Sequence, residues 1–209
     1  EVLSLAEIEK ISRGMGEFTY LLLGGGEPFL REDLGEVISI FYRNNKCLNV
    51  AVSTNGSLPE TILKTVRSVL KYFKNNLTIN VSFDGINEAH DRIRQLPGIF
   101  EKAKQTYRGL KELKSEYPNL NAGIILTCSP FNYKELDKTY TWLKENLKPY
   151  SLVMNYMRGR VRDKENLPEI DLSAYEKVMH MIEHDNLSAD LPGHGNFAFS
   201  DFNLASKMI

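Results

Sequence analysis

The stretch YLLLGGGEP, residues 20–28, is the most informative feature of the sequence because it joins an apolar run to three glycines, a carboxylate and a proline. A short apolar run bounded by glycine is typical of a buried strand. Glycine loses more backbone entropy on folding than any other residue and adds no side chain to the core. What glycine allows is close approach of bare backbone to another group, here with Glu27 beside it. Taken alone, the stretch indicates either a plain turn or a binding loop.

The composition is that of an ordinary globular protein. Of the 209 residues, 42% are hydrophobic and 25% are charged, which suits one α/β domain or one domain with an appendage. The formal net charge of −1 argues against a protein that binds nucleic acid through bulk electrostatics. There is no run of about 18 apolar residues and no visible secretory leader, so we expect no membrane partner.

The two cysteines, Cys47 and Cys128, lie far apart and have no metal-ligand spacing. We therefore expect a cytoplasmic, reducing compartment and no disulfide framework. Cys47 is interpreted as a buried residue at a strand edge. Cys128 stands at a predicted strand end and is the more suspect of the two as a reactive thiol, although a lone thiol proves nothing.

Strands and helices alternate along the chain. Runs rich in Val, Ile and Leu predict strands at residues 19–23, 48–53, 77–83, 121–126 and 151–156. Segments with helical periodicity lie between them, and a further helix is expected at residues 171–184. This alternation leaves a (β/α) barrel or an open doubly wound sheet, and both place their chemistry at the carboxyl ends of the strands.

Helix starts are predicted from capping patterns, in which a polar residue is followed three positions later by glutamate. These pairs are Ser4 with Glu7, Ser57 with Glu60, Asn132 with Glu135, and Ser173 with Glu176.

Each predicted strand ends in small, polar or glycine residues. These ends are residues 24–27, 53–56, 82–85, 127–129 and 155–160. Because the carboxyl ends of parallel strands meet at one edge of a sheet, five such ends indicate a single ligand lying across that edge.

Taken together, these motifs resemble the radical S-adenosylmethionine (radical SAM) enzymes. The resemblance is carried by Gly25-Gly26-Glu27-Pro28, Ser53-Thr54-Asn55-Gly56, Ser82-Phe83-Asp84-Gly85, His90-Asp91 and Arg94. Their order and spacing are most similar to the group that holds the molybdenum-cofactor cyclases, the sulfatase-maturing enzymes and the SPASM-type peptide-modifying enzymes.

The resemblance implies an α/β fold, a partial (β/α)6 TIM-like barrel of parallel strands that lacks its first strand in this chain. It covers roughly residues 1–162, which we interpret as the core barrel. It fades over residues 163–209, which we interpret as a C-terminal helical extension and tail. A barrel without one edge strand exposes unpaired backbone, so we expect reduced stability or self-association of the fragment.

The resemblance also implies that S-adenosylmethionine binds across the strand ends. The implied cofactor-binding residues are Gly24, Gly25, Gly26, Glu27, Thr54, Asn55, Ser82, Arg94, Asn155 and Tyr156. The glycines and Glu27 would accept hydrogen bonds from the α-amino group of the methionine moiety. Ser82 and Arg94 would hold its carboxylate.

The remaining residues of this set have looser assignments. Thr54 and Asn55 stand where the family contacts the ribose or the methionine tail, and Asn155 and Tyr156 would border the adenine. His90 with Asp91 is interpreted as a structural hydrogen-bonding pair rather than a catalytic dyad. Asp84 with Gly85 is compatible with a simple Asx-type turn.

The family requires a [4Fe–4S] cluster held by a Cys-x3-Cys-x2-Cys loop after the first barrel strand. The cluster would cleave S-adenosylmethionine reductively to a 5′-deoxyadenosyl radical, which abstracts hydrogen from a small-molecule or peptide substrate. The implied electron donor is a flavodoxin or a ferredoxin. The strand and the cysteine loop do not occur in this sequence, so the chain as written is expected to be an inactive part of an oxidoreductase, and no catalytic residue can be named.

Two explanations of the missing loop remain open, an unseen N-terminal segment and a degenerate family member. The start at Glu1 rather than Met and the intact ligand set favour the first. Two other functions also remain open. One is a non-catalytic barrel that binds S-adenosylmethionine or a nucleotide as a sensor or scaffold. The other is an unrelated (β/α) enzyme whose glycine loop binds phosphate, which Glu27 would repel.

Overall fold

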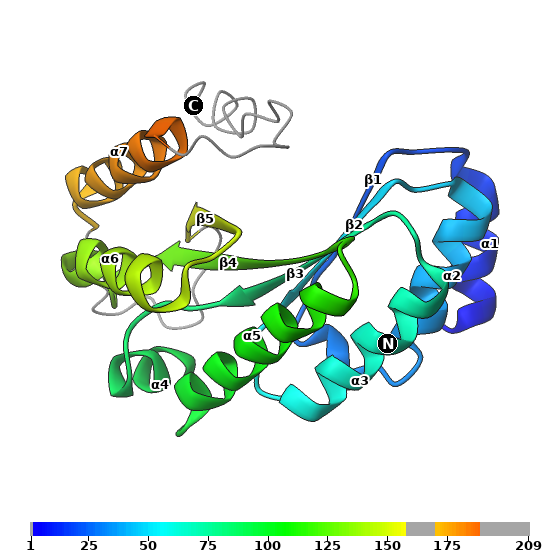
Figure 1. Cartoon of the computed structure of the whole chain (residues 1–209), viewed down its shortest axis with the longest axis horizontal. Coiled ribbons are helices and arrows are strands. Elements are labelled where there is room, and N and C mark those ends of the chain that lie inside the picture. Colours follow the sequence, from blue (N-terminus) through cyan, green and yellow to red (C-terminus); the bar gives the residue numbers. More distant parts are fainter. Residues whose placement is uncertain (1, 158–169, 189–209) are drawn as a thin grey trace.

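The computed structural model describes residues 2–157 and 170–188. Within this part of the chain, five strands form one sheet in the order β1-β2-β3-β4-β5, and every neighbouring pair is parallel. The strands are β1 (Tyr20–Leu23), β2 (Asn49–Thr54), β3 (Asn76–Ser82), β4 (Leu120–Cys128) and β5 (Ser151–Tyr156). The sheet curls into a half-barrel with helices (Figure 1). The predicted partial TIM-like barrel is confirmed, and the strand bounds shift by one or two residues.

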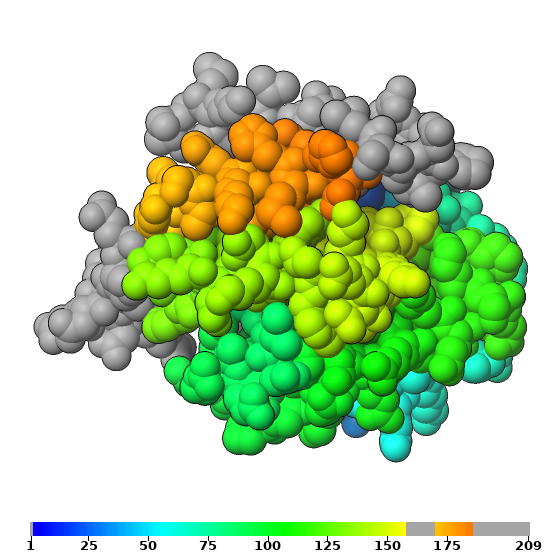
Figure 2. All heavy atoms as spheres, turned by 60° about the vertical axis from the view of Figure 1, so that its left-hand side comes forward, coloured from blue at the N-terminus to red at the C-terminus, as the bar shows by residue number. Residues whose placement is uncertain are grey.

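The helices are α1 (Leu5–Met15), η1 (Pro28–Leu30), α2 (Leu34–Asn45), α3 (Pro59–Tyr72), α4 (Glu88–Arg94), α5 (Ile99–Glu116), η2 (Tyr133–Glu135), α6 (Leu136–Leu147) and α7 (Leu172–Ser188), where η denotes a 3-10 helix. Helix α1 precedes the first strand, α7 follows the last one, and the other helices lie between successive strands. Helices α2, α3 and α5 follow one another along one side of the sheet (Figure 1), and α7 lies over α6 and β5 (Figure 2). No helix in the described residues is long and apolar enough to cross a membrane.

Two apolar clusters fill the space between sheet and helices. The larger one joins β1 to β4 with α2, α3 and α5, and its fully buried aromatic side chains are Phe73, Phe83, Phe100 and Tyr107. The smaller one joins Leu126 of β4 with α6 and with Val178 of α7. The smaller cluster attaches α7 to the sheet.

Of the four capping predictions, the pair Ser4 and Glu7 is confirmed and the other three are wrong, the one at Asn132 being described with the site below. The Glu7 backbone N–H donates to Ser4 Oγ at 3.3 Å, and the Ser4 N–H donates to Glu7 Oε2 at 2.8 Å. Helix α3 instead begins at Pro59 with Leu58 as N-cap, because proline suits the first helical position and has no N–H that would need an acceptor there. Helix α7 begins one residue before Ser173, whose N–H donates to Asp171 Oδ1 at 2.9 Å.

The loop after β2 is packed against α5 at Gly56. This glycine has φ +74°, and a Cβ built on it would lie 2.8 Å from Ala103 Cα. Thr106 Oγ1 donates a hydrogen bond to the Gly56 carbonyl oxygen at 2.9 Å. Glycine is therefore required here by the packing of α5 on the loop.

Strand β1 pairs with β2 on one side and has no neighbour on the other side within the described residues. Its Tyr20 and Leu22 side chains are 57% and 64% exposed. An exposed apolar edge strand is a template for pairing with another chain. The predicted free edge is thus present in the described sheet.

We predict that this 209-residue chain self-associates through the β1 edge, and that Leu22→Lys shifts it toward the monomer. A lysine on an edge strand opposes edge-to-edge pairing because its charge would have to be desolvated. Sedimentation velocity over a range of concentrations measures the effect. A chain that is monomeric at all concentrations, with or without the substitution, contradicts the prediction.

Candidate functional site

The carboxyl ends of all five strands meet along one edge of the sheet. The register pairs Leu23 with Val52, Thr54 with Val81, and Ser82 with Ile125. The segments that follow the strands therefore lie next to one another, as expected for a site at the carboxyl ends of a parallel sheet.

The three glycines after β1 are exposed. Gly25 has φ +134°, a conformation that glycine adopts without strain. A Cβ added to Gly24, Gly25 or Gly26 would meet no atom of the chain within 4 Å. Packing therefore does not explain glycine at positions 24 and 26. The backbone of this loop is open to an approaching molecule, and its contact with the amino group of S-adenosylmethionine stays a prediction.

Glu27 is held by the end of the neighbouring strand. Its Oε1 accepts hydrogen bonds from Thr54 Oγ1 at 2.8 Å and from the Phe29 N–H at 3.2 Å, and its Oε2 accepts from the Asn55 N–H at 2.7 Å. A carboxylate has about four lone-pair sites, so these three bonds leave capacity for one further donor. An ammonium group beside the glycine loop is such a donor, and it complements the negative charge.

Thr54 and Asn55 orient Glu27 in this structure. Thr54 is buried, and its hydroxyl also accepts a hydrogen bond from the Gly56 N–H at 3.1 Å. Asn55 Oδ1 accepts from the Ser57 N–H at 2.8 Å, which closes a local turn. Direct contact of these two residues with a ligand stays a prediction.

Ser82 and Arg94 lie at the end of β3 and the end of α4. Ser82 is half-buried and is the last residue of its strand. The Arg94 guanidinium contacts Asp84 through Nη2 and Oδ2 at 2.5 Å, and its Nε is buried without a hydrogen-bond partner. A guanidinium has five N–H donors, so Arg94 retains donors that match a carboxylate. The two residues fit the carboxylate group of S-adenosylmethionine.

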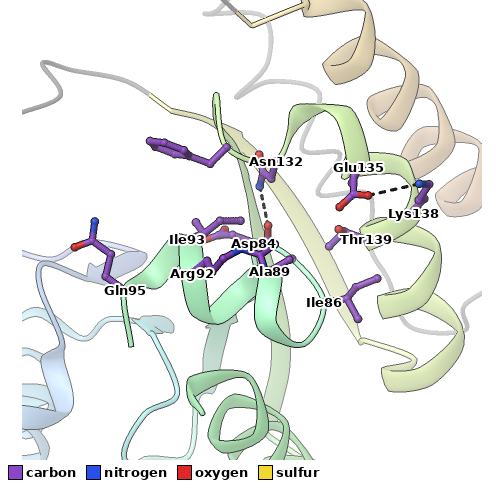
Figure 3. A pocket seen from close by; sticks show the side chains of 12 residues that line it. Asp84, Ile86, Ala89, Arg92, Ile93, Gln95, Asn132, Glu135, Lys138 and Thr139 are labelled. Carbon is purple, nitrogen blue, oxygen red and sulfur yellow. Dashed lines mark hydrogen bonds and ion pairs between the residues drawn. The ribbon is translucent and has the colours of Figure 1, made fainter. Parts of the chain in front are cut away.

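Asp84 and Asn132 join the ends of β3 and β4, a role that the sequence did not reveal. Asp84 Oδ1 accepts from the Thr127 N–H at 2.9 Å. Asn132 Nδ2 donates to the Asp84 carbonyl oxygen at 2.9 Å (Figure 3) and to the Thr127 carbonyl oxygen at 2.7 Å. Asp84 is thus not confined to a local turn. The signal available in the sequence was the polar residue at each of two successive strand ends.

The predicted capping pair of Asn132 with Glu135 is wrong. Asn132 Oδ1 accepts from the Ser129 N–H at 2.7 Å, while Glu135 pairs with Lys138 at 3.5 Å. The asparagine side chain is used to fix the strand end instead of the helix start.

A pocket of about 430 Å³ lies beside this network, between α4 and the η2–α6 segment (Figure 3). Its lining residues are Asp84, Gly85, Ile86, Ala89, Arg92, Ile93, Gln95, Phe131, Asn132, Glu135, Lys138 and Thr139. The glycine loop and Glu27 are not among them, so this pocket is separate from the glycine-loop side of the site.

His90 and Asp91 have structural roles, and they do not form a dyad. His90 is fully buried, and its Nδ1 accepts from the Asp84 N–H at 3.0 Å. Burial lowers the pKa of His90 to about 4. Asp91 caps α5 by accepting from the Phe100 N–H at 2.9 Å and the Gly98 N–H at 2.6 Å, and these bonds, that from Phe100 first, lower its pKa.

The two cysteines are buried in different apolar clusters. Burial raises the pKa of the Cys128 thiol to about 11 and also raises that of Cys47. The chain has two cysteines, and they lie apart in separate buried clusters, so they do not form the set of thiolates that a [4Fe–4S] cluster needs. Among the described residues, no three His, Cys, Asp or Glu side chains gather closely enough to hold a metal ion.

The last two predicted site residues lie on β5, at the opposite edge of the sheet from Glu27. Asn155 is exposed. The half-buried Tyr156 ring packs edge-on against Tyr175 of α7, with ring centroids 5.8 Å apart. The structure therefore brings Glu27, Thr54 and Asn55 into contact but leaves Asn155 and Tyr156 apart from them.

Some interpretations fall on residues that the structure does not describe. These are an anion-binding or solvated loop at Arg158, Arg160 and Arg162, and a loop or strand at the tail from Leu191 that includes His194. The proposed boundary between residues 162 and 163 lies there too, and the division into two domains stays a prediction.

The family model of the radical SAM superfamily matches residues 1–143. The chain belongs to the radical SAM superfamily. It is 32% identical over 165 residues to the AdoMet-dependent heme synthase of Methanosarcina barkeri, a match that covers 77% of this chain and 42% of the relative. It is 27% identical over 148 residues to the GTP 3′,8-cyclase of Cronobacter sakazakii, covering 68% of this chain and 41% of the relative.

Solved structures of the same fold include native anSMEcpe with bound AdoMet and the Kp18Cys peptide. The TM-score is 0.59 at 18% identity, over 98% of this chain and 54% of that one. A histidine-tagged form of anSMEcpe with bound AdoMet gives a TM-score of 0.61 at 18% identity, over 89% of this chain and 53% of that one. This radical SAM chain spans about two fifths of the curated relatives and about half of these structures.

We predict that acid destabilises this radical SAM chain in part through His90. The folded pKa of about 4 lies below the ordinary 6.5, so the unfolded chain binds the extra proton first as the pH falls. The free energy of unfolding should therefore fall as the pH is lowered from 6.5 to about 4. The loss is up to roughly 3 kcal/mol, because one pKa unit corresponds to about 1.4 kcal/mol.

Urea unfolding of the natural chain and of His90→Gln, measured across that pH range, tests this prediction. Glutamine does not titrate, so the free energy of unfolding of the variant should fall less steeply. Equal slopes would show that His90 does not carry the effect.

Proposed function

We propose that the full-length protein is a radical SAM oxidoreductase and that this chain supplies its S-adenosylmethionine clamp. The observation that carries the proposal is the pairing of an acceptor and a donor at one sheet edge. Glu27 presents a fixed carboxylate beside the glycine loop, and Arg94, at the end of α4, retains N–H donors beyond the one paired with Asp84. An α-amino acid has an ammonium group and a carboxylate, and these two side chains match both.

In this proposal, the described residues bind and orient S-adenosylmethionine. The glycine loop and Glu27 receive the α-amino group, and Ser82 and Arg94 receive the carboxylate. When bound, S-adenosylmethionine and a [4Fe–4S] cluster supply the 5′-deoxyadenosyl radical that takes hydrogen from the substrate. Because Cys47 and Cys128 are buried in different clusters, the proposal assigns the thiolate ligands of the cluster to another part of the full-length protein.

The two alternative functions differ in what supports them. A phosphate-binding glycine loop is disfavoured, because the Glu27 carboxylate is fixed beside that loop and repels an anion. A sensor or scaffold that binds S-adenosylmethionine without a cluster uses the same clamp, so it is separated from the enzyme by activity alone.

The substrate and the electron donor are proposed as classes. The relatives are named for heme synthesis and for GTP cyclisation, and a solved structure of the fold holds a peptide. Their shared element is the radical SAM domain, so we propose a small-molecule or peptide substrate and a flavodoxin or ferredoxin as donor.

The proposed reaction predicts that the full-length protein, reconstituted anaerobically with iron and sulfide, forms 5′-deoxyadenosine from S-adenosylmethionine on reduction. Chromatography of the quenched reaction measures the product. Arg94→Gln should need more S-adenosylmethionine for half-maximal formation, because it removes the carboxylate donor. A reconstituted protein that binds S-adenosylmethionine and forms no product in the presence of reductant would favour the sensor.

The open glycine loop gives a second prediction. Gly26→Ala should weaken S-adenosylmethionine binding while leaving unfolding within about 1 kcal/mol of the natural protein, because the added methyl group meets no atom of the chain. Isothermal titration and thermal unfolding measure the two effects.

Gly56→Ala is the matched control for this variant. Its methyl group would lie 2.8 Å from Ala103 Cα, so it should lower the unfolding temperature, unlike Gly26→Ala. If Gly26→Ala binds S-adenosylmethionine as tightly as the natural protein does, the ligand does not approach the backbone at this loop.

A further inference from the structure

Asp84 is bonded through every polar group that it has. Its N–H donates to His90 Nδ1 at 3.0 Å, and its carbonyl oxygen accepts from Asn132 Nδ2 at 2.9 Å. Its Oδ1 accepts from the Thr127 N–H at 2.9 Å, and its Oδ2 contacts Arg94 Nη2 at 2.5 Å. Both carboxylate oxygens are therefore fixed, one by the end of β4 and the other by the end of α4.

The pair of Asp84 and Arg94 is shielded from water unevenly. The Asp84 side chain is 6% exposed and the Arg94 side chain 29% exposed. A charged pair in such surroundings is weakly screened, so the carboxylate determines where the guanidinium lies. The Arg94 side chain stays partly exposed, and we expect a second anion to reach its guanidinium from solvent.

The position of Arg94 in the backbone does little to order its side chain. Arg94 is the last residue of the seven-residue helix α4, and Gln95 follows it with φ +54° in the left-handed region. A long side chain at a helix end has many rotamers, and ordering them on binding lowers affinity. A buried carboxylate that has already ordered the side chain removes much of that loss.

We propose that Asp84 is a positioning residue that presents the Arg94 guanidinium to the methionine carboxylate of S-adenosylmethionine. The proposal rests on the proposed function. Asp84 acts through Arg94 and does not touch the ligand, and Asn132 supports it by fixing the Asp84 carbonyl to the end of β4.

The test compares two ligands on the full-length protein reconstituted anaerobically with iron and sulfide. S-adenosylmethionine has the carboxylate that Arg94 would receive, and 5′-methylthioadenosine has neither that carboxylate nor the amino group. We expect Asp84→Asn to weaken S-adenosylmethionine binding about tenfold, the lower range for a charged hydrogen bond, and to leave 5′-methylthioadenosine binding unchanged. Isothermal titration measures both affinities.

Two further variants show whether the effect passes through Arg94. Arg94→Gln should weaken S-adenosylmethionine binding to a similar degree, and the double variant should be no weaker than either single one, because the two substitutions remove one interaction. The matched control is Asp91→Asn, which removes a nearby carboxylate that caps α5 and does not contact Arg94. It should not change the ratio of the two affinities.

The outcomes are distinguishable. If Asp84→Asn leaves the ratio of the two affinities unchanged, whether both fall equally or neither falls, Asp84 is only a structural residue and the inference is overturned. Additive losses of affinity in the double variant also overturn it. Should Asp84→Asn not fold, Asp84→Glu, which keeps the charge but moves the carboxylate, decides on the same ratio. A natural protein that binds 5′-methylthioadenosine and not S-adenosylmethionine contradicts the proposed function itself.

Discussion

All five strands of the described sheet run parallel and pair with their neighbours in sequence order, so each strand delivers its carboxyl end to the same edge. This arrangement places segments side by side that are 27 residues or more apart in the chain, such as Glu27 with Thr54 and Asp84 with Thr127. A slip of one residue in any pairing would turn the strand-end side chains to the other face. The candidate site therefore depends on the register that the buried apolar faces fix.

The two halves of the proposed clamp are oriented by different interactions. Glu27 is fixed by a backbone N–H and a hydroxyl at the end of β2. Both donors are neutral, so the negative charge of the carboxylate remains suited to an ammonium group. Arg94 is fixed by the buried charge of Asp84 and retains donors for a carboxylate. An acceptor and a donor, each ordered before the ligand arrives, lower the entropic cost of binding an amino acid between them.

The sequence predicted the features that local pattern determines. Apolar runs located all five strands, and the polar or glycine residues behind them located the edge that carries the site. The capping pattern failed at Ser57 because Pro59 starts α3, and at Ser173 because Asp171 takes the capping role. The links from Asp84 to Thr127 and Asn132 span 43 and 48 residues, and no local signal specifies which strand-end amide a buried carboxylate will reach.

In the proposed clamp, Glu27 and Arg94 hold the two ends of one amino-acid moiety. A crystal structure of the full-length, reconstituted protein with S-adenosylmethionine bound would show whether they do. We expect the α-amino nitrogen about 3 Å from a Glu27 oxygen or a glycine-loop carbonyl, and the carboxylate at the same distance from the Arg94 guanidinium. S-adenosylmethionine bound with its carboxylate away from Arg94, or seated in the pocket between α4 and α6, would contradict it.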